Sequence, residues 1–245
     1  MIVYLTSHIG GSYKKDGTRT PTQLSTENGL LDNLQKHWKD NSNILIISSD
    51  ADDVERNDSI MNIFAVSFPM SGLSISQIHI CDKRNEGLVD NIADYDVLIL
   101  AGGHVPTQNK FFKKICLKEH INDFDGILIG ISAGTMNSAE VVYAQPELEG
   151  ESIDQKYERF LSGLGITELM ILPHYQDIKD DILDGQRLFE EITYPDSYGR
   201  EFYALEDGSY FMIEGKATTL FGAAYLIKDG AIKQICEKDK SICMT

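Results

Sequence analysis

Short apolar runs without polar alternation recur along the first two thirds of the chain, separated by polar turns and by segments with helical spacing. Runs of this kind are typical of strands that are buried on both faces. Leu30, Leu31, Leu34 and Trp38 illustrate the helical spacing between two such runs. We expect strands at residues 2–5, 43–47, 75–80, 96–100, 127–131 and 169–172, and helices around 30–38, 53–68, 86–93, 107–120 and 180–192.

This alternation of strands and helices predicts an α/β fold with a doubly wound, mostly parallel sheet and helices on both faces. The pattern changes from Glu201 onward, where short strands are separated by glycine turns and predict a β-rich C-terminal part. Residues 7–20 are polar and glycine-rich and predict a loop, and residues 145–166 predict a loop with some helix. No repeat or linker interrupts the chain, so we expect one domain over residues 1–245. The C-terminal strands are expected at residues 202–205, 210–213, 218–221 and 225–227.

A G-x-S-x-G pattern, Gly130-Ile131-Ser132-Ala133-Gly134, follows the apolar strand at 127–131 and leads into a small-residue segment that can be helical. Strand, tight turn with serine, and helix are the context of a nucleophile elbow. Glycine is needed on both sides because a Cβ there would collide with neighbouring backbone. The competing interpretation is a glycine-bounded turn in an ordinary α/β domain.

A serine nucleophile needs a base within hydrogen-bond reach, and His174 is the candidate. It is the only histidine after the elbow, and it follows Pro173 at the end of a predicted strand. His104 lies beside Gly102-Gly103, where it is expected to line the site rather than act as the base. Of the remaining histidines, His8 gives no indication, and structural roles are expected for His37, His79 and His120.

Acyl transfer also needs hydrogen-bond donors aimed at the oxyanion. The N–H of Ala133 is one candidate, and Gly103, with Gly102 beside it, is the second, because a backbone can approach closely there. The acid that would orient His174 stays open. Asp207 is the best candidate, and the alternatives are Glu206, Asp177, Glu140, Glu147, Glu149 or no acid at all.

Composition narrows the possible partners. The chain carries a formal net charge of −16, which disfavours nucleic acid and anionic membranes. Its four cysteines form no C-x-x-C, and no histidine lies at metal-ligand spacing beside them, so we expect free thiols, no metal and no cofactor. The first residues do not resemble a signal peptide, and no apolar run is long enough to cross a membrane, so we expect a cytoplasmic protein.

Taken together, Gly102-Gly103, the elbow at 130–134 and Pro173-His174-Tyr175 resemble the peptidase E (aspartyl dipeptidase) and cyanophycinase family. The fold of that family resembles class I glutamine amidotransferases and is flavodoxin-like. The resemblance implies serine-peptidase chemistry on a small peptide, with Ser132 as nucleophile, His174 as base and the two oxyanion donors named above. An α/β-hydrolase is not expected, because its histidine comes late in the chain, after the acid.

The chain departs from this family at two places. Better-known members have a glutamate where this chain has Ser209, so Asp207 or Glu206 would have to substitute. The stretch after the glycine pair, at residues 104–108, also differs from the family and would line the pocket. Aspartyl specificity would require a basic residue in that pocket, and the sequence does not indicate one.

The leading hypothesis is therefore a serine peptidase that hydrolyses small peptides, with the substrate's side chain undetermined and a homodimer left open. The alternative is a non-catalytic binding or sensing protein on an amidotransferase-like scaffold, because fold does not fix function. A glutamine amidotransferase is a weaker third hypothesis, since that chemistry needs cysteine at the elbow and this chain has Ser132.

Overall fold

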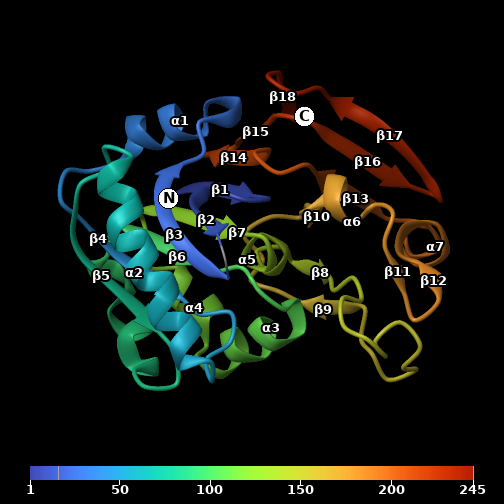
Figure 1. Ribbon diagram of the computed structural model, residues 1–245, viewed down its shortest axis with the longest axis horizontal. Coiled ribbons are helices and arrows are strands. Elements are labelled where there is room, and N and C mark those ends of the chain that lie inside the picture. The colour runs from blue at the N-terminus through green and yellow to red at the C-terminus, as the bar shows by residue number, and fades with distance from the viewer. Residues whose placement is uncertain (16, 245) are drawn as a thin grey trace.

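The computed structural model describes residues 1–15 and 17–244, and its centre is an eight-stranded sheet (Figure 1). Five strands run parallel, in the order β1 (Ile2–Thr6), β7 (Ile127–Ile131), β6 (Val97–Leu100), β4 (Ser42–Ile47) and β5 (Ile75–Cys81). Beyond β1 the sheet continues antiparallel with β14 (Tyr210–Glu214), β15 (Ala217–Phe221) and β18 (Ser241–Met244). The mostly parallel central sheet predicted from the apolar runs is confirmed.

Helices cover both faces of this sheet, as predicted. Val3 and Leu5 of β1 belong to a buried cluster with Phe111, whereas Tyr4 between them packs in a separate cluster with Phe68. Alternate residues of one strand thus point into two cores, which explains why the strand sequences lack polar alternation. One face carries α1 (Leu30–His37) and α2 (Val54–Met70), and the other carries η2 (Glu86–Asp94), α3 (Val105–Lys114) and α4 (Leu117–Ile121).

A second sheet of four strands forms much of the C-terminal part, at the upper right in Figure 1. Its order is β10 (Met170–Leu172), β13 (Glu201–Leu205), β16 (Ala224–Lys228) and β17 (Ala231–Cys236), with only β10 and β13 parallel. The chain enters this sheet at β10 and returns to the large sheet at β14. The smaller elements are η1 (Glu27–Gly29), α5 (Ala133–Asn137), β8 (Val141–Tyr143), β9 (Phe160–Ser162), α6 (Tyr175–Ile178), η3 (Leu188–Thr193) and α7 (Tyr194–Asp196).

The predicted loop at residues 7–20 is wrong, because the chain forms a hairpin there, β2 (Gly10–Lys15) and β3 (Thr18–Leu24). The hairpin lies on α2, and its outer residues stay exposed. A strand that buries so little of itself needs few apolar residues, so the hydrophobic pattern gave no signal.

The predicted helix at residues 180–192 is also wrong. Asp184 and Gly185 both adopt positive φ, which turns the chain into a small hairpin of β11 (Ile182–Leu183) and β12 (Gln186–Arg187) before a short π-helical segment, η3. The helix predicted at 107–120 is interrupted at Cys116, whose φ of 49° separates α3 from α4. Residues 145–166 contain β9 and turns in place of the expected helix, and the edge strands β17 and β18 were not predicted.

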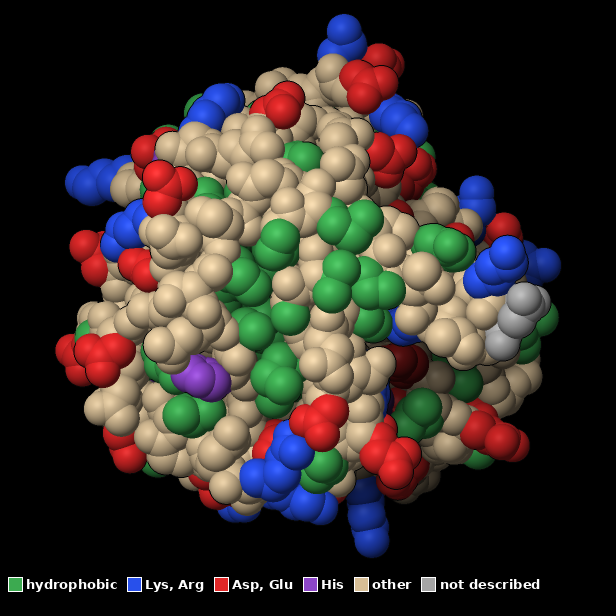
Figure 2. Space-filling model, turned by 60° about the vertical axis from the view of Figure 1, so that its left-hand side comes forward, with side chains coloured by type: hydrophobic (Ala, Val, Ile, Leu, Met, Phe, Trp, Pro, Cys, Tyr) green, Lys and Arg blue, Asp and Glu red, His purple; other side chains and the backbone are tan. Residues whose placement is uncertain are grey.

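Figure 2 shows acidic and basic side chains mixed around the margin of one face, with hydrophobic side chains grouped near its middle. Within the described residues, no helix is both long and apolar enough to cross a bilayer.

Candidate active site

Ser132 lies between β7 and α5, on the sharp turn that the G-x-S-x-G pattern predicts. Its backbone has φ 51° and ψ −112°, a conformation that a non-glycine residue rarely adopts, and its N–H donates to the carbonyl of Thr6 at 3.1 Å. A Cβ on Gly134 would lie 2.2 Å from the carbonyl oxygen of Leu100, and one on Gly130 would lie 2.9 Å from the Cα of Thr135. Both glycines are therefore required by close backbone approach.

The side chains of Ser132 and His174 meet although they come from different sheets. His174 follows β10 of the smaller sheet, and its Nε2 lies 2.7 Å from the Oγ of Ser132. The backbone of His174 is itself unusual, with φ 136° and ψ 40°. Ser132 and His174 thus both have strained backbone conformations, and their side chains converge. Strained residues of this kind cluster at functional sites.

Asp207 is the carboxylate that contacts this histidine. It lies in the turn between β13 and β14, and its Oδ1 is 2.8 Å from His174 Nδ1, while its own N–H donates to Gln176 Oε1 at 3.0 Å. Burial alone would raise the pKa of Asp207, but hydrogen bonds from His174 and Ser7 outweigh burial and hold that pKa below its usual value. The carboxylate is therefore ionised at neutral pH.

The other acids considered from the sequence make different contacts. Glu206 accepts a hydrogen bond from Tyr225, and Asp177 accepts one from Gln176. The hydroxyl of Ser209, at the position where the family resemblance implies an acid, is buried and donates to the carbonyl of Ala223. Within the described residues, the short hydrogen bonds of the His174 ring go to Ser132 and Asp207, and the Ser7 hydroxyl lies 3.4 Å from Nδ1.

The glycine pair lies directly beside the serine. A Cβ on Gly102 would approach the Cβ of Ser132 to 3.2 Å, and one on Gly103 would lie 2.4 Å from the Oγ of Ser49. Arg56 Nη2 donates to the carbonyl of Gly102 at 3.0 Å. Because C=O and N–H point in opposite directions across a trans peptide, this bond fixes the N–H of Gly103 pointing away from Arg56. None of the hydrogen bonds found among the described residues uses the N–H of Gly103 or Ala133.

A cavity of about 600 Å³ opens at Ser132, His174 and the glycine pair. Its other wall comes from the β2–β3 hairpin and the first turns of α2. Three basic side chains line it, Lys14, Arg19 and Arg56. The sequence does not indicate these residues, because Lys14 and Arg19 lie on a hairpin with little apolar pattern and Arg56 lies on a helix that carries no motif.

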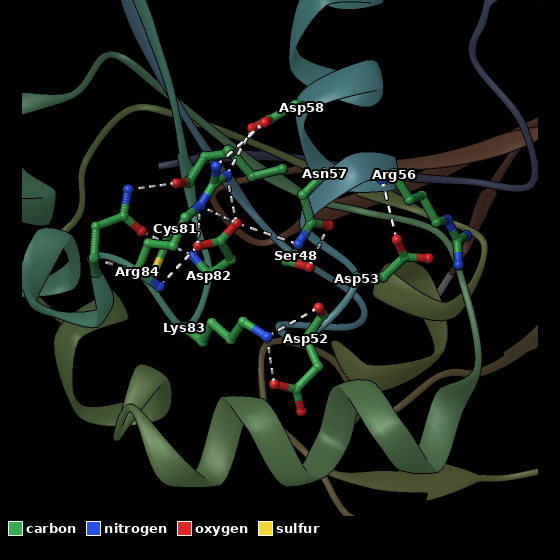
Figure 3. A network of polar contacts seen from close by, with 12 residues as sticks. Ser48, Asp52, Asp53, Arg56, Asn57, Asp58, Cys81, Asp82, Lys83 and Arg84 are labelled. Atoms are coloured by element: carbon green, nitrogen blue, oxygen red, sulfur yellow. Dashed lines mark hydrogen bonds and ion pairs between the residues drawn. The ribbon is translucent and has the colours of Figure 1, made fainter.

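Arg56 is held by a polar network at the start of α2, shown in Figure 3. The carboxylate of Asp53 caps the helix by accepting the N–H of Arg56 at 3.1 Å. Asn57, one residue on, bonds to Ser48 and to the buried carboxylate of Asp82. The network ties the first turn of α2 to the ends of β4 and β5. The backbone of Arg56 is therefore held in place where its side chain lines the cavity.

The expectation that His104 lines the site is not supported, because His104 is not among the described residues that line the cavity. His104 does not contact the reacting groups: its Nδ1 lies 2.8 Å from Thr107 and its Nε2 lies 2.8 Å from Glu151. His8, for which the sequence gave no indication, lines the cavity and accepts the N–H of Gly10 on Nδ1. Burial lowers the pKa of His8 below its usual value, so it is neutral at pH 7.

In the described part of the chain, no group of three or more His, Cys, Asp or Glu residues is arranged to hold a metal ion. The four cysteines are free thiols, and none of them lies at the elbow.

Comparison with known proteins gives one family and a set of similar folds. Residues 18–221 match the sequence model of peptidase family S51. A crystal structure of a peptidase from an acI-B1 Actinobacterium superposes with a TM-score of 0.68 at 17% identity, over 99% of this chain and 96% of that one. A candidate peptidase E protein from Listeria monocytogenes EGD-e superposes with a TM-score of 0.57 at 15% identity, over 96% and 98% of the two chains. No curated protein sequence matches the chain.

Proposed function

Because this chain belongs to peptidase family S51, a family of serine-type hydrolases, we propose that it hydrolyses small peptides with Ser132 as nucleophile and His174 as base. Asp207 is the acid that orients the base. The observation that supports this most strongly is the continuous hydrogen-bonded line from Ser132 Oγ through the imidazole to Asp207 Oδ1, at 2.7 and 2.8 Å. Such a line is the geometric signature of an activated serine, whatever the order of the residues in the chain.

Each group has a definite task in the reaction. Ser132 Oγ attacks the scissile carbonyl while His174 Nε2 takes its proton, and the same nitrogen then returns that proton to the leaving amine. Asp207 accepts the Nδ1–H of His174, which fixes the tautomer that leaves Nε2 free to accept. Water repeats the sequence on the acyl-enzyme and releases the carboxylate product. The Asp207 contact also argues against a non-catalytic module, because the displacement of the acid from the position of Ser209 was a reason to consider one.

The oxyanion of the tetrahedral intermediate would accept hydrogen bonds from the N–H groups of Gly103 and Ala133. Both donors lie next to Ser132 and are free of other bonds among the described residues. Arg56 holds the Gly102-Gly103 peptide in place through the Gly102 carbonyl, so this donor needs no rearrangement during the reaction.

The cavity suggests which small peptides fit. A volume of about 600 Å³ suits a ligand of two or three residues. Lys14, Arg19 and Arg56 give its wall positive charge in a chain whose net charge is −16. We therefore expect a short peptide that carries a carboxylate next to the scissile bond.

Hydrolysis of a matched series tests this function. Asp-Leu, Asn-Leu and Lys-Leu differ in the charge of one side chain, and amine release is followed for the wild type and for Ser132→Ala. We expect Asp-Leu to be cleaved fastest, and Ser132→Ala to reduce its cleavage to background. Cleavage that survives Ser132→Ala would contradict the mechanism, and equal cleavage of all three peptides would contradict the substrate class.

A further inference from the structure

Ser7, immediately after β1, joins the two ends of the candidate active site. Its neighbour Thr6 accepts the N–H of Ser132 at 3.1 Å, which anchors the elbow. Ser7 itself donates its N–H to the carbonyl of Ser209 at 3.1 Å, which anchors the turn that carries Asp207. Ser7 is 0% exposed, so solvent cannot replace its contacts.

The hydroxyl of Ser7 faces the acid and the base together. It donates to Asp207 Oδ1 at 2.6 Å, and its oxygen lies 3.4 Å from His174 Nδ1. The oxygen of Asp207 that accepts the Nδ1–H of His174 is therefore the same oxygen that accepts the Ser7 hydroxyl. A carboxylate oxygen has two lone pairs, so both bonds form at once and the carboxylate is held from two directions.

We propose that Ser7 is a positioning residue for this site: its hydroxyl fixes the orientation of the Asp207 carboxylate toward His174. The proposal rests on the function proposed above. The terminal torsion of an aspartate is broad, so a single hydrogen bond to the histidine leaves the carboxylate free to rotate. The second bond, from a fully buried donor immediately after β1, removes that freedom.

Loss of the Ser7 hydroxyl should lower the rate of the reaction without weakening substrate binding. Without the bond from Ser7, the Asp207 carboxylate can rotate away from the position in which it accepts the Nδ1–H of His174. A poorly oriented carboxylate stabilises the transition state less. Ser7 does not line the cavity, so substrate binding is not expected to change.

A purely structural role would lower stability without these effects, so the test needs a matched control. Ser209→Ala serves, because Ser209 is also buried, is 1% exposed, and donates one hydrogen bond to a carbonyl, that of Ala223, without touching Asp207 or His174. Both variants lose one buried hydroxyl bond from the same region, so a similar loss of thermal stability is expected for both.

The experiment compares the wild type, Ser7→Ala and Ser209→Ala. It measures the rate of fluorophosphonate labelling, and kcat and KM for the peptide that the wild type cleaves fastest. For Ser7→Ala we expect the labelling rate and kcat to fall about tenfold, from the loss of a hydrogen bond to a charged group, with KM within about twofold. The imidazole Nδ1–H resonance should also shift in the NMR spectrum. Ser209→Ala should leave the labelling rate, kcat, KM and the Nδ1–H resonance unchanged.

Two further variants keep the test decisive. Ser7→Cys retains a weak donor of similar size, so it should label at an intermediate rate even if Ser7→Ala folds poorly. Ser7→Ala should add little in the background of Asp207→Asn, because it acts through that carboxylate. A wild type that labels while Ser7→Ala behaves like Ser209→Ala would overturn the role of Ser7 alone. A wild type that does not label would overturn the proposed function, and the role of Ser7 with it.

Discussion

Gly134 is the position where one added methyl group should damage the elbow most. The Cβ of alanine at 134 would lie 2.2 Å from the carbonyl oxygen of Leu100 and 2.7 Å from its Cβ. Both atoms belong to the end of β6, which is fully buried and pairs with strands on both sides. Neither neighbour is a flexible side-chain end, so α5 and the elbow must move away from the sheet.

The structure sets the size of the effect. A tolerable contact requires a shift of about 1 Å, and overpacking of this kind typically costs about 1–3 kcal/mol. For a chain of this length, that cost lowers Tm by roughly 2–12 °C. A displacement of about 1 Å at Ser132 should slow the reaction on the order of 100-fold, because the serine leaves the line to His174.

The assay compares Gly134→Ala with Gly87→Ala by thermal unfolding and by labelling rate at a temperature well below both values of Tm. A Cβ on Gly87 meets nothing closer than the Oδ2 of Asp90 at 3.5 Å, so this control should match the wild type in both measurements. A Gly134→Ala variant with wild-type Tm and labelling rate would refute the reasoning that close approach to β6 sets the elbow.

Three further outcomes are expected. Asp207→Asn should lower kcat about 10³- to 10⁴-fold with little change in KM in steady-state assays, because it loses the correct histidine tautomer; a change below tenfold would contradict its role. Although burial opposes it, Arg84 holds the pKa of Asp82 below its usual value, so the stability this pair contributes is present above about pH 4 and is lost as pH falls through the lowered pKa. Thermal melts at decreasing pH should show this loss, and Asp82→Asn should flatten it; parallel curves would contradict the assignment. Arg19→Gln should reduce the preference for Asp-Leu over Asn-Leu about fivefold, and an unchanged ratio would remove Arg19 from substrate selection.

The parts of the fold that the sequence predicted share one physical property, full burial. The runs at 43–47, 96–100 and 127–131 have no polar face, so their apolar residues alone identify the strands. The hairpin of β2 and β3 was not predicted because its strands are largely exposed, and the helix at 180–192 was wrongly predicted because turn conformation determines that segment. Positive φ at Asp184 and Gly185 overrides an amphipathic pattern that would otherwise favour a helix.

The residues of the candidate site also differ in how far the sequence alone indicates them. Ser132 and His174 could be singled out because each follows a predicted strand, although the two strands belong to different sheets. Asp207 stayed among several acids because it lies in a turn between two sheets, and no local pattern fixes which turn side chain reaches the histidine. Ser7 and Arg56 have no motif, and only the packing brings them to the site. A single domain, a homodimer and a cytoplasmic location stay predictions.

The central claim is that the hydroxyl of Ser132 is an activated nucleophile. The most direct measurement is the mass of the intact protein, and then of its peptides, after treatment with a fluorophosphonate. The account predicts one adduct per chain, located on Ser132 and lost in His174→Gln as well as in Ser132→Ala. An unmodified wild-type protein, or an adduct on any other residue, would contradict it.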